Sequence, residues 1–182
     1  MQRFPVFTIE TAPEKSRPAL QALRGAFGMI PNVAGAMATS AVLIDSLVGL
    51  FGKVHGGSFT EAQIQVLLLT NAVTNRCAWA VAFHTGLALQ QGLDQADVEA
   101  IRERRVPKDT TSAALSTFAR TLIEKRGRVD DSEVDAFMAA GFGKEHALEV
   151  IAVVAASTIT NYTGSVTRPP VDEPFEAYVW SV

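Results

Sequence analysis

The stretch NRCAWAVAFH, residues 75–84, contains the only cysteine of the chain, Cys77, and one of its three histidines, His84. It follows a polar break at Thr74-Asn75 and opens a segment whose pattern predicts a helix. A thiol in the first turn of a helix lies near converging backbone N–H groups, which favour the thiolate. His84 is two turns further along the same face. A lone cysteine in an apolar helical protein is also commonly a small buried hydrophobe, so both interpretations stay open.

Outward from this stretch, the sequence predicts helix after helix and no strand with alternating polarity. Residues 60–63, Thr-Glu-Ala-Gln, have the form of a capping box, and Ser40 and Asp94 are suitable N-caps. The predicted helices cover about residues 17–27, 32–38, 41–54, 61–73, 77–91, 94–104, 109–127, 130–141 and 144–162. We therefore expect one all-α domain over residues 1–182, a compact bundle of many helices with irregular arms at 1–15 and 168–182.

Composition excludes several classes of function. The chain has 182 residues, a net charge of −3 and no basic stripe, which disfavours nucleic-acid binding. A single cysteine forms no intrachain disulfide. The N-terminus lacks the pattern of a signal peptide, and the longest apolar run, residues 147–159, is too short to cross a bilayer. These features predict a cytoplasmic protein that does not bind membranes. With 48% hydrophobic residues, part of its surface is expected to be buried between subunits.

No motif for a metal or a cofactor is present in the sequence. There is no glycine-rich phosphate loop, no paired-cysteine motif and no histidine pair at metal-ligand spacing. His55 beside a Gly-Gly break and His146 in a first helical turn are interpreted as solvated surface residues. We therefore expect no metal and no cofactor.

The cysteine segment resembles the alkylhydroperoxidase D (AhpD) and carboxymuconolactone decarboxylase superfamily. The resemblance rests on Asn-x-Cys followed by an aromatic residue, a histidine seven residues after the cysteine, and a helix that ends at Gly92. The apolar run over residues 59–69 and the segment Ile30-Pro31-Asn32-Val33 are similar to the flanks in peroxidase-related members. The resemblance covers about residues 25–165 and implies an AhpD-like helical bundle that forms dimers, trimers or hexamers.

Two departures from the family motif affect its chemistry. Redox-active members carry a Glu, then Cys-x-x-Cys twelve residues later, then a His four residues after the second Cys. Matched position by position, Cys77 is the first cysteine and His84 the histidine, but Ala80 stands at the second cysteine and Gln65 at the glutamate. An amide cannot accept a proton as a carboxylate base, although it can orient a water or His84. The two-cysteine peroxidase mechanism is therefore not expected here.

Three hypotheses for the function follow, with Cys77, His84 and Gln65 as the candidate catalytic residues. The first is a one-cysteine oxidoreductase with peroxide or thiol–disulfide chemistry, an antioxidant enzyme like the peroxiredoxins, re-reduced by an external thiol. The second is a lyase or isomerase in which His84 is the general acid or base on a small carbonyl acid. The third is a non-catalytic homo-oligomer. The substrate is expected to be a small molecule, either a peroxide or a small organic acid.

Overall fold

The computed structural model describes residues 3–181, and every regular element within that range is a helix. The α-helices are α1 (Arg17–Phe27), α2 (Asn32–Met37), α3 (Ala41–His55), α4 (Glu61–Thr74), α5 (Ala78–Gln90), α6 (Gln95–Arg102), α7 (Thr110–Glu124), α8 (Asp131–Ala139) and α9 (Lys144–Thr167). Short 3₁₀ helices cover Glu14–Ser16 and Glu173–Tyr178. The prediction of an all-α fold is confirmed.

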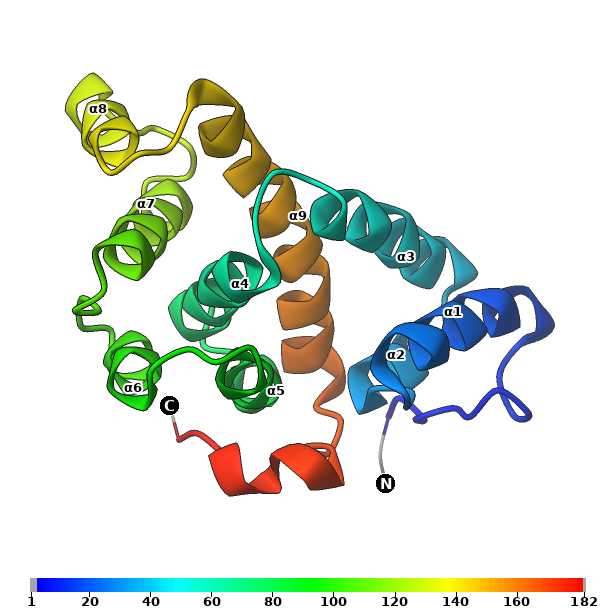
Figure 1. Cartoon of the computed structure of the whole chain (residues 1–182). Helices are drawn as coiled ribbons and strands as arrows, with labels where there is room; N and C mark the ends of the chain where they lie inside the picture. The colour runs from blue at the N-terminus through cyan, green and yellow to red at the C-terminus, as the bar shows by residue number, and fades with distance from the viewer. Residues whose placement is uncertain (1–2, 182) are drawn as a thin grey trace.

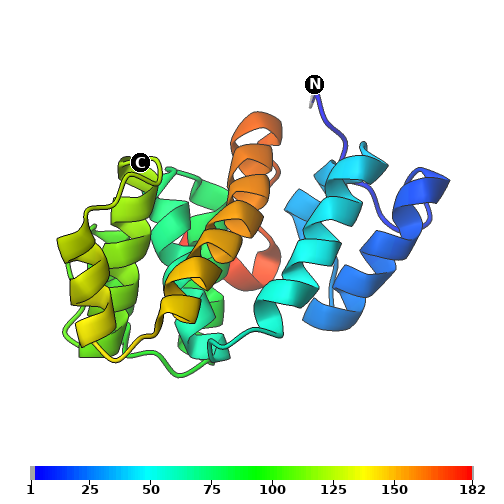
Figure 2. The ribbon, with the colours of Figure 1, turned by 90° about the horizontal axis from the view of Figure 1, so that it is seen from above.

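Helices α4, α5 and α9 form the centre of the molecule. Helix α9 runs between α1–α3 on one side and α4–α8 on the other, as the two views show (Figures 1 and 2). Helix α4 packs against α5, α7 and α9, and α3 packs against α9. Every residue from Ile64 to Val73 is buried, because an apolar helix with neighbours on several sides has almost no face left for water.

Helix α9 is the one element of the described chain that is long and apolar enough to cross a membrane by length and composition alone. In the fold it is instead packed against α2, α3, α4 and α5. Val150, Val153 and Ala156 lie in the core, whereas Leu148 and Ile151 are exposed. The helix therefore has one buried face and one apolar face on the surface.

Local signals position most of these helices as expected. The Thr60 hydroxyl accepts from the N–H of Gln63, whose side chain accepts from the Thr60 N–H, so the predicted capping box is present. Ser40 and Asp94 also cap their helices. Ser16, the residue before α1, makes no capping hydrogen bond. Its hydroxyl donates to the carbonyl of Ala38, which ties the 3₁₀ helix Glu14–Ser16 to the end of α2.

The structure corrects two predicted boundaries. Helix α9 extends five residues beyond the expected end at residue 162. The C-terminal arm, predicted to be irregular, contains the 3₁₀ helix Glu173–Tyr178, which packs against α5. Phe175 of this arm is buried against Gly86, where even one added Cβ atom would lie 2.7 Å from the phenyl Cε1. Glycine at position 86 is what lets the arm approach α5.

Candidate functional site

The structure brings two of the three candidate residues together. Gln65 lies on α4 and His84 on α5, and Gln65 Oε1 is 3.0 Å from His84 Nδ1. An amide oxygen only accepts hydrogen bonds, so Nδ1 must carry the proton and donate it. The neutral imidazole therefore keeps its lone pair on Nε2. Gln65 fixes both the ring orientation and the tautomer, as an orienting partner does for a catalytic histidine.

Burial controls the protonation of His84. The residue is 6% exposed, and Gln65 is 4% exposed. Desolvation, helped by the charge of nearby His55, lowers the pKa of His84 from 6.5 to about 3. The imidazole is consequently neutral at any pH near neutrality, and its Nε2 atom is a permanent acceptor.

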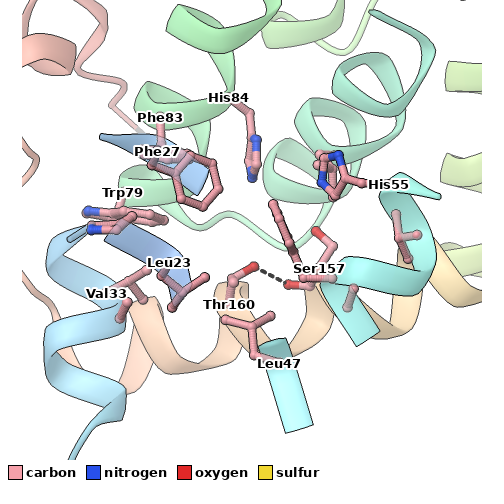
Figure 3. Close-up of a pocket in the computed structure, with 16 residues that line it drawn as sticks. Leu23, Phe27, Val33, Leu47, His55, Trp79, Phe83, His84, Ser157 and Thr160 are labelled. Atoms are coloured by element: carbon pink, nitrogen blue, oxygen red, sulfur yellow. Dashed lines mark hydrogen bonds between the residues drawn. The ribbon is translucent and has the colours of Figure 1, made fainter. Parts of the chain in front are cut away.

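His84 faces a small apolar cavity of about 60 Å³ between α1, α3, α5 and α9. Figure 3 shows Phe27, Trp79 and Phe83 on one side of it, with His84 and His55 on the other. Its lining residues are Leu23, Phe27, Pro31, Val33, Ala34, Leu47, Phe51, Val54, His55, Leu68, Trp79, Phe83, His84, Ala156, Ser157 and Thr160. Among the lining residues that the structure describes, the polar side chains are the hydroxyls of Ser157 and Thr160, the imidazoles of His55 and His84, and the indole of Trp79, whose N–H is bound to Asp172. The cavity can therefore hold a small molecule with one or two polar atoms.

Trp79 forms one wall of this cavity, and contacts on the side of its ring away from the cavity fix its position. Its ring stacks on Phe83 with centroids 4.8 Å apart. Its Nε1 donates to Asp172 Oδ2 at 2.9 Å, and Asp172 Oδ1 accepts from the N–H of Asn32 at 2.8 Å. Burial raises the pKa of the Asp172 carboxyl, more than these two hydrogen bonds lower it. The C-terminal arm thus fixes the cavity wall to the start of α2.

Cys77 lies apart from the histidine pair. It is the N-cap of α5, is 2% exposed and does not line the cavity. Its Sγ atom packs against Gly164 of α9, so closely that a Cβ atom there would be 2.7 Å away. No hydrogen bond joins Cys77 to His84 or Gln65 among residues 3–181.

The environment of the sulfur disfavours the thiolate. Burial raises the pKa of the Cys77 thiol above its usual value, more than the N–H groups of Ala80 and Trp79 and the hydroxyl of Ser165 lower it. The sulfur makes no capping hydrogen bond of regular geometry. Desolvation therefore outweighs the helix N-terminus, which by itself favours the thiolate.

His55 is the residue of the site that the sequence did not reveal. Its interpretation as a solvated surface histidine is wrong, because its ring lines the cavity and Nε2 is buried without a partner. Nδ1 lies 2.9 Å from Glu61 Oε2. The only signal in the sequence was a glutamate six residues later, at the start of the next helix. Arg76, the one cation of the motif, is exposed and does not line the cavity.

Within residues 3–181, no group of three His, Cys, Asp or Glu side chains is arranged to hold a metal ion. The cavity also lacks the arginine or lysine side chains that usually bind phosphate-bearing cofactors. In this arrangement, the two imidazoles can accept protons from a bound molecule, or deliver protons to it, in an apolar space.

Comparison with known proteins agrees with this fold. Residues 46–122 match the carboxymuconolactone decarboxylase family. A search of curated protein sequences gives no significant match. Residues 46–122 thus resemble a carboxymuconolactone decarboxylase domain, and the AhpD-like resemblance predicted from the sequence is confirmed.

Three solved structures share the fold over nearly the whole chain. An AhpD-core, peroxidase-related protein from Ralstonia eutropha JMP134 has 17% identity and a TM-score of 0.81, covering 95% of this chain and 93% of its own. The debrominase Bmp8 has 15% identity and a TM-score of 0.80, with 98% and 96% covered. A peroxidase-related protein from Silicibacter sp. TM1040 has 14% identity and a TM-score of 0.76, with 95% and 92% covered. At these identities the likeness establishes the fold alone.

Proposed function

We propose that this protein is an AhpD-like enzyme of the lyase or isomerase class, in which His84 moves a proton on a small carbonyl acid bound in the cavity. The observation that carries the proposal is the buried imidazole itself. Its Nδ1 is fixed by Gln65 and its ring lines the cavity. A general base must keep its free nitrogen unprotonated and must lie within hydrogen-bond distance of the substrate, and both conditions are favoured here.

The low pKa of His84 suits a general base that takes up a proton only when negative charge develops on the substrate. Burial keeps the ring neutral. A negative charge forming on a bound substrate would stabilise the imidazolium and raise the proton affinity of Nε2. That interaction is stronger in the transition state than in the ground state, which is what accelerates a reaction. The apolar lining keeps water from competing for the proton.

The size of the cavity restricts the substrate. At about 60 Å³ it is smaller than the roughly 150 Å³ that accommodates benzene in an engineered protein cavity. A short-chain acid fits, whereas a larger ring requires movement of the wall. A cysteine-to-alanine variant of the debrominase Bmp8 was solved with 2,3,4-tribromopyrrole, which supports small-molecule binding by this fold.

Peroxide or thiol–disulfide chemistry at Cys77 is the second candidate. The N–H groups of Trp79 and Ala80 and the hydroxyl of Ser165 favour its thiolate, and two structural neighbours are described as peroxidase-related. Burial of the sulfur and its separation from His84 make this the less favoured hypothesis. An external thiol reductant is required only under this hypothesis.

Deuterium exchange separates the two candidates. Pyruvate and 2-oxobutyrate are incubated with the enzyme in D₂O, and loss of the proton next to the carbonyl is followed by NMR. We expect exchange above the buffer rate, lost in His84→Gln and retained in Cys77→Ser. Exchange at the buffer rate, with peroxide turnover that Cys77→Ser abolishes, would contradict the proposal and favour the redox hypothesis.

We also propose a homo-oligomer that forms through α9, in a cytoplasmic protein. Supporting this, exposed apolar residues of α9 lie three, four or seven residues apart, as on one side of a helix: Leu148, Ile151, Ala155, Tyr162 and Val166. An apolar groove lies beside this α9 stripe and is lined by Met37, Leu43 and Ile159. Apolar side chains that repeat every three and four residues pack against a second helix. We therefore propose that the partner is a second copy of this chain.

A further inference from the structure

We propose that His55, supported by Glu61, is a second proton-transfer group of the cavity, and that the two imidazoles together bind one small weak acid with uptake of one proton. This inference rests on the proposed function at His84, and it adds a residue pair that the family motif does not contain. It also restricts the proposed substrate to small acids with a single carboxyl group.

The first observation is the way the His55 ring is held. Its Nδ1 lies 3.0 and 2.9 Å from the two carboxylate oxygens of Glu61. Phe51 packs on the ring with centroids 4.0 Å apart. Nδ1 donates to the carboxylate, so Nε2 is the free atom, and it is buried with no hydrogen-bond partner among residues 3–181. A buried nitrogen without a partner costs free energy unless a ligand satisfies it.

The second observation is that one helix holds both imidazoles. Glu61 and Gln65 are four residues apart on α4, hence on one face of it, and each binds the Nδ1 of one histidine. The two partners differ in charge. A carboxylate stabilises an imidazolium, whereas an amide does not. The proton that is taken up with the ligand is therefore placed on His55, and His84 stays the neutral acceptor.

Among residues 3–181, we find no other titratable group near His55 that would take up the proton. From α5 it is faced by His84, and a charge on either imidazole disfavours a charge on the other. From α9 the lining residues are Ala156, Ser157 and Thr160, which do not titrate near neutral pH. Glu149 of the same helix is bound to Ser58. Lys53 lies on the exposed part of α3.

The chemistry of the ligand follows from this arrangement. No lysine or arginine is among the lining residues, so a carboxylate can be neutralised only by an imidazolium. On binding, one proton is taken from solvent onto Nε2 of His55, which then donates to one oxygen of the anion. The carbon next to the acid group faces His84, because the lone pair on Nε2 of the neutral ring cannot donate to the second carboxylate oxygen. No bond is formed or broken other than that to the proton, and a dicarboxylate would leave one charge buried and unpaired.

Isothermal titration calorimetry tests the proposal with propionate, and with propionamide as the neutral control ligand. Titrations at pH 6.5 and 7.5 in two buffers of different ionisation enthalpy give the number of protons taken up. We expect proton uptake on propionate binding, at most one proton per ligand, and a Kd that weakens as the pH rises, by up to about tenfold per pH unit. Propionamide should take up none.

Variants assign the proton to the proposed pair. Glu61→Gln should weaken propionate binding at least about tenfold, the scale of one lost charge-assisted hydrogen bond. His55→Gln should remove the proton uptake. Glu145→Gln is the matched control, since Glu145 also lies in a first helical turn but is exposed and outside the cavity; it should bind as the wild type does. Melting temperatures confirm that each variant is folded.

Three outcomes would overturn the inference. They are no propionate binding, binding without proton uptake, and binding equally tight in Glu61→Gln. Deuterium exchange that His84→Gln abolishes, but His55→Gln leaves unchanged, would reject His55 and keep His84. Proton-linked binding that needs His55 and Glu61, with no exchange by the wild type, would support the inference as binding and reject the proposed reaction.

Discussion

At the scale of single residues, the fold makes two potentially reactive side chains unequal. His84 and Cys77 both lie in or next to α5 and both are buried. Burial disfavours the charged form of each, so His84 loses its proton more easily and Cys77 keeps its proton. The neutral imidazole is the form that accepts a proton, whereas the neutral thiol is the inactive form. The same physical effect therefore favours His84 and disfavours Cys77.

The pKa of His84 has a consequence for stability. The native value of about 3 lies below the 6.5 of an exposed histidine, so between these values the unfolded chain binds more protons. The free energy of unfolding therefore falls as the pH drops from 6.5 towards 3, by up to about 1.4 kcal/mol per pH unit.

Urea unfolding of the wild type and of His84→Gln across this window measures that contribution. The difference between the two free energies should shrink as the pH falls. Asp172, whose pKa is raised, has the opposite trend in both proteins and cancels in the difference. A difference that is independent of pH would show that His84 titrates normally.

Cys77 should react slowly with iodoacetamide at neutral pH. Because burial raises the pKa of its thiol, we expect the midpoint of the pH profile to lie at or above the free-thiol value of about 8.5. The same protein in urea supplies the rate of an exposed thiol. A midpoint well below 7 in the folded protein would instead support the redox hypothesis.

At the scale of the elements, glycine decides where the C-terminal arm docks. Gly86→Ala would place a Cβ atom 2.7 Å from Phe175 Cε1, so the arm must shift. We expect a loss of about 1–3 kcal/mol of stability, the usual cost of overpacking, with faster hydrogen exchange over residues 171–178. Gly49→Ala is the control, because nothing lies within 4 Å of its added Cβ atom. Equal stability of the two variants would contradict the docking.

The sequence predicts these elements well wherever a local signal exists. Thr60, Ser40 and Asp94 identify helix starts because capping is a contact within one turn. The end of α9 was misplaced because Thr163 and Thr167 look like poor helix formers. In the structure their hydroxyls donate to carbonyls four residues earlier in the helix.

The candidate site was only partly predictable for the same reason. Gln65 could be matched by resemblance, and it is the residue that holds His84. His55 could not be found, because its place in the cavity depends on how the end of α3 packs beside α4 and α5. The distance between Cys77 and the cavity also depends on tertiary packing, here the close approach of α9 at Gly164.

At the scale of the whole molecule, α9 both supports the cavity and presents an apolar face to the surface. Ser157 and Thr160 face inward, while Leu148 and Tyr162 are 68% and 61% exposed. A stripe of this kind is unusual on a monomer. We therefore propose that the central helix has a role in assembly as well as in the site.

Sedimentation velocity should therefore find an oligomer that depends on this stripe. Ile151→Glu and Tyr162→Glu place charges within it and should shift the protein to the monomer, since a charge in an apolar interface is desolvated without a partner. Val106→Glu, an apolar-to-acidic change at an exposed position away from α9, is the matched control. A monomeric wild type would contradict the proposed interface.

Long-range ¹⁵N–¹H NMR of the imidazoles shows whether His84 is a neutral acceptor that Gln65 holds in the cavity. The structure predicts that His84 carries its proton on Nδ1 and does not titrate between pH 8 and 5, because its pKa is about 3. Gln65→Ala should release the ring and mix the tautomers. If His84 carried its proton on Nε2, or titrated with a midpoint near 6.5, it would not be the neutral proton acceptor proposed here.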